Sequence, residues 1–153
     1  MKWQAALAGA LASAFVSFAA SSIAMPSTAS ADVLIVGDPG GVVSAFVRKY
    51  EEIRDSGQRV EIDGPCLSAC TLLTGIVPRS HICVTSRAML GFHAASYYDD
   101  ASRSLVPTRE GSALVMRLYP AEIRGWIARH GGLTPHMIQL RGRDLAALYQ
   151  TCR

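Results

Sequence analysis

The sequence lacks a marked excess of charge of either sign. It contains 15 basic and 12 acidic residues among 153, a formal net charge of +3. Proteins that bind nucleic acid through its phosphates need a clear basic excess on one face, so we expect no nucleic-acid partner. Half of the residues are hydrophobic, which argues against intrinsic disorder because such a chain can bury a core.

Charge is absent from the stretch between Lys2 and Asp32, which is rich in Ala, Ser and Leu. Its last residues, 29–31, read Ala-Ser-Ala and match the small-x-small pattern of a signal-peptide cleavage site. Residues 1–31 are therefore interpreted as a secretory signal peptide. No cysteine lies near this cleavage region, which excludes a lipoprotein signal.

Two alternatives concern the same segment. Cleavage after Ala24 also fits the small-residue rule, and an uncleaved membrane anchor over residues 3–24 would nearly span a bilayer. Few residues in that stretch drive stable insertion, so cleavage is favoured. We expect an exported protein, periplasmic or secreted, with no later membrane span, whose residues 32–153 form one domain.

Cysteine is scarce, and all of it lies after the predicted signal peptide. The four cysteines are Cys66, Cys70, Cys83 and Cys152. An even number in an exported chain favours two disulfides. Of the three pairings, we expect Cys70–Cys83, which closes a short helix–strand loop, and Cys66–Cys152, which ties down the C-terminus. Buried free thiols remain an alternative, as does a zinc site, for which no second ligand pair stands at matching spacing.

Apolar runs and helical spacings alternate between residues 33 and 93. The sequence predicts strands at 33–36, 59–63, 82–85 and 89–93, and helices at 42–56 and 68–76. Glycine-rich turns separate these segments. Such alternation is typical of an α/β fold with parallel strands joined by right-handed crossovers.

The pattern changes in the rest of the chain. Residues 97–107 are polar and are interpreted as a loop, and helical patterns dominate from Thr108 onward. Pro120 and Pro135 interrupt these patterns and suit the first turns of helices. Trp126, within one helical segment, is expected in the core.

Two glycine-rich turns follow two of the predicted strands. The turn at 64–70 (Gly-Pro-Cys-Leu-Ser-Ala-Cys) places Ser68 at a helix start, where free N–H groups and the helix dipole favour a developing oxyanion. A serine hydroxyl needs a base to become a nucleophile, and His93 follows a later strand. Gly40 and Gly41 offer N–H groups that can approach a substrate closely. Each feature alone has a simpler explanation, such as a helix cap, a structural histidine or a plain turn.

The order of these features resembles the proteolytic subunit of Clp protease, in the ClpP/crotonase superfamily. In that family a Ser-Pro-Gly-Gly turn precedes a helix, as the Asp-Pro-Gly-Gly turn at 38–41 does here, and the nucleophilic serine opens the next buried helix. The interval of 25 residues from Ser68 to His93 is also as in that family. The chain looks more closely like small exported bacterial members, with Cys-x-Ser-Ala-Cys-Thr and Gly-Phe-His at these positions. The resemblance covers residues 33–95 and implies β-α-β units with a helical C-terminal part.

The resemblance implies a role for each matching residue. Ser68 would be the nucleophile and His93 the general base, and the N–H groups of Gly41 (or Val42) and Ala69 would form the oxyanion hole. The implied reaction is acyl transfer to water through an acyl-enzyme, on a peptide or a small acyl substrate, without a cofactor.

The family's third catalytic residue is an Asp that orients the histidine, and it corresponds by position to residues 141–144. The closest match by position is Arg or Gly, and Asp144, a few residues away, is the carboxylate that could orient His93. The simpler interpretation of Asp144 is a solvated or helix-capping charge. A backbone carbonyl, Asp99 and Asp100 are alternatives. Homo-oligomers are common in the resembled family, although no feature of this sequence marks an interface.

Rival functions stay open from the sequence. The chain could be a catalytically silent member used for binding or as a scaffold, or a crotonase-type module that binds the thioesters of coenzyme A. Cys66 or Cys70 could also form a thiol dyad with His93. Residues 97–100 either line a substrate cleft or form a plain exposed loop. The histidines without ligand spacing, interpreted as surface or helix-end residues, are His81, His130 and His136.

Overall fold

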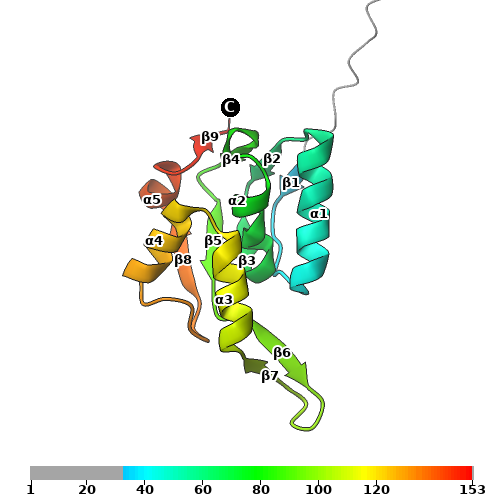
Figure 1. Ribbon diagram of the computed structural model, residues 1–153. Helices are drawn as coiled ribbons and strands as arrows, with labels where there is room; N and C mark the ends of the chain where they lie inside the picture. Colours follow the sequence, from blue (N-terminus) through cyan, green and yellow to red (C-terminus); the bar gives the residue numbers. More distant parts are fainter. Residues whose placement is uncertain (1–32, 153) are drawn as a thin grey trace, which may run out of the picture.

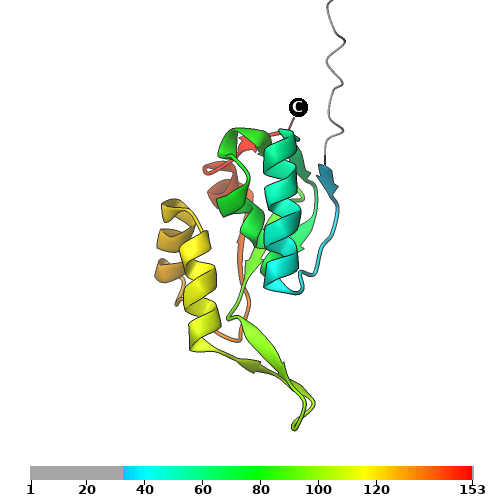
Figure 2. The same cartoon turned by 45° about the vertical axis from the view of Figure 1, so that its right-hand side comes forward.

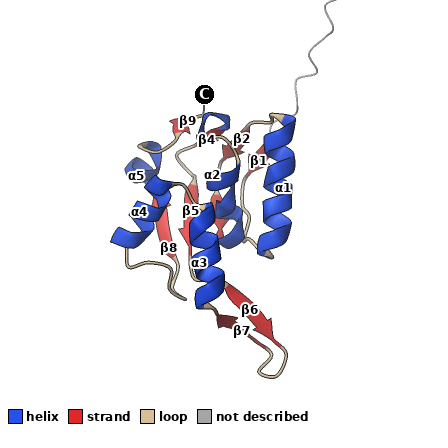
Figure 3. Cartoon of the chain, in the orientation of Figure 1, coloured by secondary structure: helices blue, strands red, loops and turns tan. Residues whose placement is uncertain are grey.

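The computed structural model describes residues 33–152, so the predicted signal peptide lies outside the described residues. The helices are α1 (Val43–Ser56), η1 (Ser68–Leu72), α2 (Leu73–Ile76), η2 (Arg79–His81), α3 (Arg109–Leu118), α4 (Ala121–Arg129) and α5 (Gly142–Ala146). The strands are β1 (Val33–Ile35), β2 (Val60–Ile62), β3 (Pro65–Leu67), β4 (Ile82–Val84), β5 (Met89–Phe92), β6 (Ser96–Asp99), β7 (Ser104–Pro107), β8 (Ile138–Arg141) and β9 (Gln150–Thr151). Figure 3 shows helices and strands interleaved along the chain, as an α/β fold requires.

Four parallel strands form one sheet, in the order β1-β2-β4-β9. Alternate residues of β2, Val60 and Ile62, are buried on the face that also receives Tyr50 and Ile53 of α1. Figure 2 shows α1 lying across this sheet as the crossover between β1 and β2. The predicted α/β class with parallel strands is confirmed here.

A second sheet has the order β3-β5-β8 and carries the residues of interest. Strands β3 and β5 are parallel, with Leu67 opposite Gly91. Strand β8 runs antiparallel to β5, with Arg141 opposite Met89. The helical pattern expected from Thr108 onward is present in α3, α4 and α5, but β8 was not predicted. Four residues are too few to separate a strand from a helix by periodicity, and pairing with β5 makes this segment a strand. Pro135 accordingly precedes a strand rather than a helix.

The segment predicted as a loop at 97–107 is instead a β-hairpin. Strands β6 and β7 pair antiparallel with Tyr98 opposite Leu105, and they project from the body of the molecule (Figure 1). Side chains on both strands are exposed, including Tyr97 and Tyr98, so the segment lacks the buried face that marks a strand in sequence.

The cysteines pair differently from the expectation. The disulfides are Cys66–Cys70 and Cys83–Cys152, not Cys70–Cys83 and Cys66–Cys152. The turn into η1 brings the Cα atoms of the first pair within 5.3 Å, and the pairing of β9 with β4 brings those of the second within 5.0 Å. No thiol is left for a zinc site or a thiol dyad. Two disulfides are compatible with an exported protein.

An aromatic cluster joins the helical part to the second sheet. Phe92 of β5 meets Tyr119 edge-on at 5.3 Å between ring centroids and lies 5.9 Å from Trp126 of α4. Trp126 is buried, which confirms its expected place in the core. Pro120 lies directly before α4, close to the first-turn position expected for it. None of the helices within residues 33–152 is long and apolar enough to cross a membrane.

Candidate active site

Ser68 occupies a left-handed backbone conformation at the junction of β3 and η1. Its φ is +55°, in a region that non-glycine residues rarely adopt, and the Cys66–Cys70 disulfide closes around it. The side chain is half-buried, whereas Ala69 and Cys70 behind it are buried. Residues held in such sparsely populated backbone conformations cluster at functional sites, so this conformation marks Ser68 as a candidate.

The carbonyl of Ser68 accepts a hydrogen bond from the Thr71 hydroxyl, which is itself bonded to the Tyr119 hydroxyl. Thr71 Oγ1 donates to Ser68 O at 2.6 Å, and the Tyr119 hydroxyl lies 2.6 Å from the same Oγ1. Because the only hydroxyl proton of Thr71 is donated to Ser68 O, the Tyr119 hydroxyl must donate to Thr71 Oγ1. Burial raises the pKa of Tyr119 to about 12, so this donor stays protonated at ordinary pH. The sequence did not point to either residue, because Thr and Tyr at these positions look like ordinary helix and core residues.

The turn at 38–41 lies directly against Ser68. The backbone of Asp38 bridges β3, accepting from Leu67 N and donating to Pro65 O, each at 2.8 Å. The Asp38 carboxylate accepts from Gly40 N at 2.8 Å. This bond between the carboxylate and Gly40 N holds the turn closed.

Two N–H groups of this turn face no protein acceptor. Within residues 33–152, the backbone N–H groups of Gly41 and Val42 make no hydrogen bond, and both residues are exposed. Ala69 N lies in the first turn of η1, where no acceptor is available within the helix. The N–H groups of Gly41, Val42 and Ala69 therefore have no partner among residues 33–152, and their role as an oxyanion hole remains a prediction.

His93 lies at the same sheet edge as Ser68. Because Leu67 and Gly91 are partners in parallel strands, both residues leave their strands at the carboxyl end. His93 is half-buried, and its Nδ1 lies 2.7 Å from the carbonyl of Ala94. A carbonyl only accepts, so Nδ1 carries the proton and Nε2 is free to act as a base.

No hydrogen bond joins Ser68 Oγ to His93 within the part of the chain that the structure describes. Hydrogen bonds of this kind are often absent without substrate and form in the substrate complex.

The two residues after His93 are held by hydrogen bonds to α3 and to the loop after α4. Ala94 N donates to Thr134 O at 2.7 Å, and Ala95 N donates to Ser112 Oγ of α3 at 3.0 Å. A hollow of about 390 Å³ opens beside this segment, and its lining residues are Ala94, Pro107, Thr108, Arg109, Ser112, Leu133 and Pro135.

The carboxylates proposed as orienting groups lie elsewhere. Asp144 follows β8, whose last residue Arg141 pairs with Met89 at the start of β5, whereas His93 follows the end of that strand. The structure therefore does not bring Asp144 to His93. Asp99 accepts from Ser102 N within the hairpin turn, where Asp100 is exposed. The group beside the His93 imidazole is the backbone carbonyl of Ala94, one of the alternatives to Asp144.

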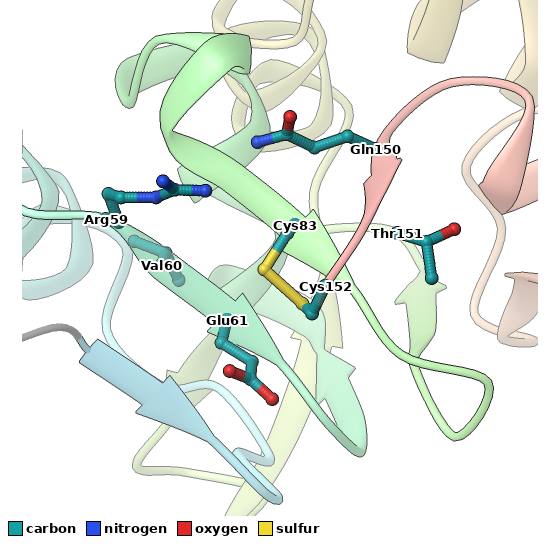
Figure 4. Close-up of a pocket in the computed structure, with 7 residues that line it drawn as sticks. All are labelled: Arg59, Val60, Glu61, Cys83, Gln150, Thr151 and Cys152. Carbon is teal, nitrogen blue, oxygen red and sulfur yellow. A yellow bond between two sulfur atoms is a disulfide. The ribbon is translucent and has the colours of Figure 1, made fainter.

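Other candidate residues are dispersed. His81 ends η2, His130 stacks on Trp126 at 4.0 Å, and His136 is exposed before β8. A second hollow, of about 390 Å³, lies on the first sheet against the Cys83–Cys152 disulfide. Figure 4 shows the residues that line it. The Glu61 carboxylate lies close to both sulfurs, but these are bonded to each other and are not available as thiolate ligands.

No protein-family model matches the chain, and a search of curated proteins finds no match.

Proposed function

We propose that this protein is an exported serine hydrolase of the ClpP/crotonase type, with Ser68 as nucleophile and His93 as general base. The observation that carries the proposal is the left-handed backbone of Ser68 at the sheet edge where His93 also emerges. Free N–H groups from two separate turns beside the serine support it further. The two disulfides accord with export.

The proposed reaction is acyl transfer to water. His93 Nε2 takes the proton of Ser68 Oγ as the oxygen attacks the carbonyl carbon of the substrate. The N–H groups of Gly41 or Val42 and of Ala69 stabilise the resulting oxyanion. The protonated histidine then gives its proton to the leaving group, which departs and leaves the acyl-enzyme. In the second half-reaction His93 takes a proton from water as the water attacks the acyl carbon, and it then returns a proton to Ser68 Oγ.

A backbone carbonyl in place of a carboxylate has a kinetic consequence. The Ala94 carbonyl selects the correct tautomer of His93, but it carries no full charge to stabilise the imidazolium. We expect slower turnover than in a triad with a buried carboxylate, and activity is best sought with activated esters and peptides with good leaving groups.

Active-site labelling tests the proposal. The oxidised protein beginning at Asp32 is treated with a fluorophosphonate, and intact mass and peptide mapping locate the adduct. A single adduct on Ser68 that disappears in Ser68→Ala and His93→Ala is expected. Ser86→Ala removes an exposed serine from the loop before β5 and serves as the matched control, which should label like the wild type.

One observation favours a second function. Ser68 and His93 are not hydrogen-bonded to each other within residues 33–152, and no carboxylate is placed on the histidine. A catalytically silent binding or scaffold protein would have these features. Absence of any adduct on folded, oxidised protein would favour that function over the hydrolase.

A further inference from the structure

The Cys66–Cys70 disulfide encloses Ser68 in a very short loop. The two cysteines are four residues apart, one in β3 and the other in η1, with Ser68 midway between them. Both cysteines are fully buried. The covalent bridge therefore constrains the backbone on both sides of Ser68 from beneath the surface.

A left-handed serine needs such constraint. The conformation is unfavourable for a residue with a Cβ, and it persists only where the surrounding structure holds it. Three contacts act on Ser68 here: the disulfide, the close packing of Gly40, and the Thr71 hydroxyl on its carbonyl. Only the disulfide is covalent and spans both sides of the turn.

The Cys83–Cys152 disulfide differs from the first in loop length, burial and location. Cys83 and Cys152 are 69 residues apart, only partly buried, and belong to the other sheet (Figure 4). Stabilisation by a cross-link rises with the length of the loop it closes, so this bridge contributes more to the free energy of unfolding than the short one does. The smaller contribution of the short bridge to global stability directs attention to its local effect.

We infer that the Cys66–Cys70 disulfide is a positioning element for the Ser68 nucleophile, so that hydrolysis requires this pair to be oxidised. The inference rests on the proposed function and adds to it a dependence on redox state. A dithiol would switch the site off: it transfers two electrons and two protons, the S–S bond breaks to give two thiols, and the reductant closes its own disulfide. Ser68 is then released toward ordinary backbone conformations, and its hydroxyl leaves the geometry that His93 requires.

Paired variants test the inference. Cys66→Ala/Cys70→Ala removes the short bridge, and Cys83→Ala/Cys152→Ala removes the long one as a matched control. We expect the first variant to lose roughly 10²-fold in the rate of fluorophosphonate labelling and in kcat for a small ester, with KM changed little. The pH midpoint of labelling should stay where it is, because His93 and its Ala94 partner are untouched. The control should label at the wild-type rate.

Graded reduction of the wild-type protein with dithiothreitol provides a second measurement. Adduct and redox state are read in the same mass spectrum, while near-ultraviolet circular dichroism reports the fold. Adducts confined to molecules with Cys66–Cys70 intact, with the fold retained after reduction, support the inference even where a variant fails to fold. Labelling regained on reoxidation is expected.

Each contrary outcome is distinct. Equal labelling of molecules with and without the short bridge overturns the inference and leaves the proposed function standing. Loss of labelling only together with loss of the fold also overturns it, because the bridge would then be merely structural. If the oxidised wild type takes no adduct, the proposed function itself fails.

Discussion

Gly40 packs so closely against Ser68 that a Cβ at position 40 would lie 2.7 Å from the Cβ of the serine. The same Cβ would lie 2.5 Å from Leu67 O and 2.8 Å from Ala69 N, and Gly40 has a φ of +83°. The turn at 38–41 and the serine turn are therefore fitted to each other, and only glycine allows this approach.

Gly40→Ala should abolish labelling of Ser68 and destabilise the protein. The left-handed backbone alone costs about 1–2 kcal/mol with a side chain, and the clash adds to it. Gly57→Ala is the matched control, since Gly57 has a φ of +71° with nothing within 4 Å of its Cβ. Urea unfolding and labelling rates check both. If Gly40→Ala labels as fast as Gly57→Ala, the fit between the two turns is irrelevant to the site.

The hydrogen-bonded hydroxyls of Thr71 and Tyr119 lead to a prediction in which two variants lose stability but only one labels more slowly. Thr71→Val removes the donor to the Ser68 carbonyl and leaves the buried Tyr119 hydroxyl unpaired, so we expect a loss of about 1–3 kcal/mol and slower labelling. Thr74→Val removes an equally buried hydroxyl, which donates to Thr71 O and does not touch Ser68. This control should lose stability without slowing the labelling, and a parallel loss of labelling in both variants would contradict the role given to Thr71.

Alkaline pH should destabilise the fold through buried tyrosines. Burial raises the pKa of Tyr119 and of Tyr149 to about 12, from 10.0 when unfolded. Because the folded state favours the neutral phenols, their contribution is complete below pH 10 and is lost as the pH rises from about 10 to about 12. A shift of this size corresponds to about 3 kcal/mol for each tyrosine. Urea midpoints across this range check the slope, which Tyr119→Phe should flatten. A urea midpoint that does not change between pH 10 and pH 12 would refute this role of the buried tyrosines.

The two disulfides should be reduced in a fixed order. Cys83–Cys152 is partly exposed and Cys66–Cys70 is fully buried, so a dithiol reaches the long bridge first. Its loss should lower the free energy of unfolding by about 4 kcal/mol, given the length of the loop it closes. Intact mass and mapping of alkylated thiols under native conditions follow the order. Simultaneous reduction of both bridges would mean that burial does not protect the short one.

Asp144→Asn should leave labelling of Ser68 unchanged within about twofold. Asp144 lies at the opposite end of β5 from His93, and the Ala94 carbonyl already holds the imidazole. His93→Ala, measured beside it, should remove labelling. A loss of tenfold or more in Asp144→Asn would show that this carboxylate does reach the histidine.

Local patterns predicted most of the fold around the serine, but not all of it. The alternation of β1, α1, β2, β4 and β5 and the turn at 38–41 follow from residue spacing and glycine, because these signals act over a few residues. The sequence missed β3 (Pro65–Leu67), which lies within the segment interpreted as a turn at 64–70. The roles of Ser68 and His93 remain predictions that labelling tests.

The sequence by itself determined that the chain alternates strand and helix in its first half, that its cysteines are even in number, and that a serine lies at a predicted helix start while a histidine follows a later predicted strand. Only the tertiary structure decided which cysteines pair, that Ile138–Arg141 is a strand, and that Asp144 lies away from His93. These features depend on contacts between segments that are far apart in the chain, such as the pairing of β8 with β5. Such pairing is set by hydrogen bonds and burial between segments, which no local pattern of residues encodes.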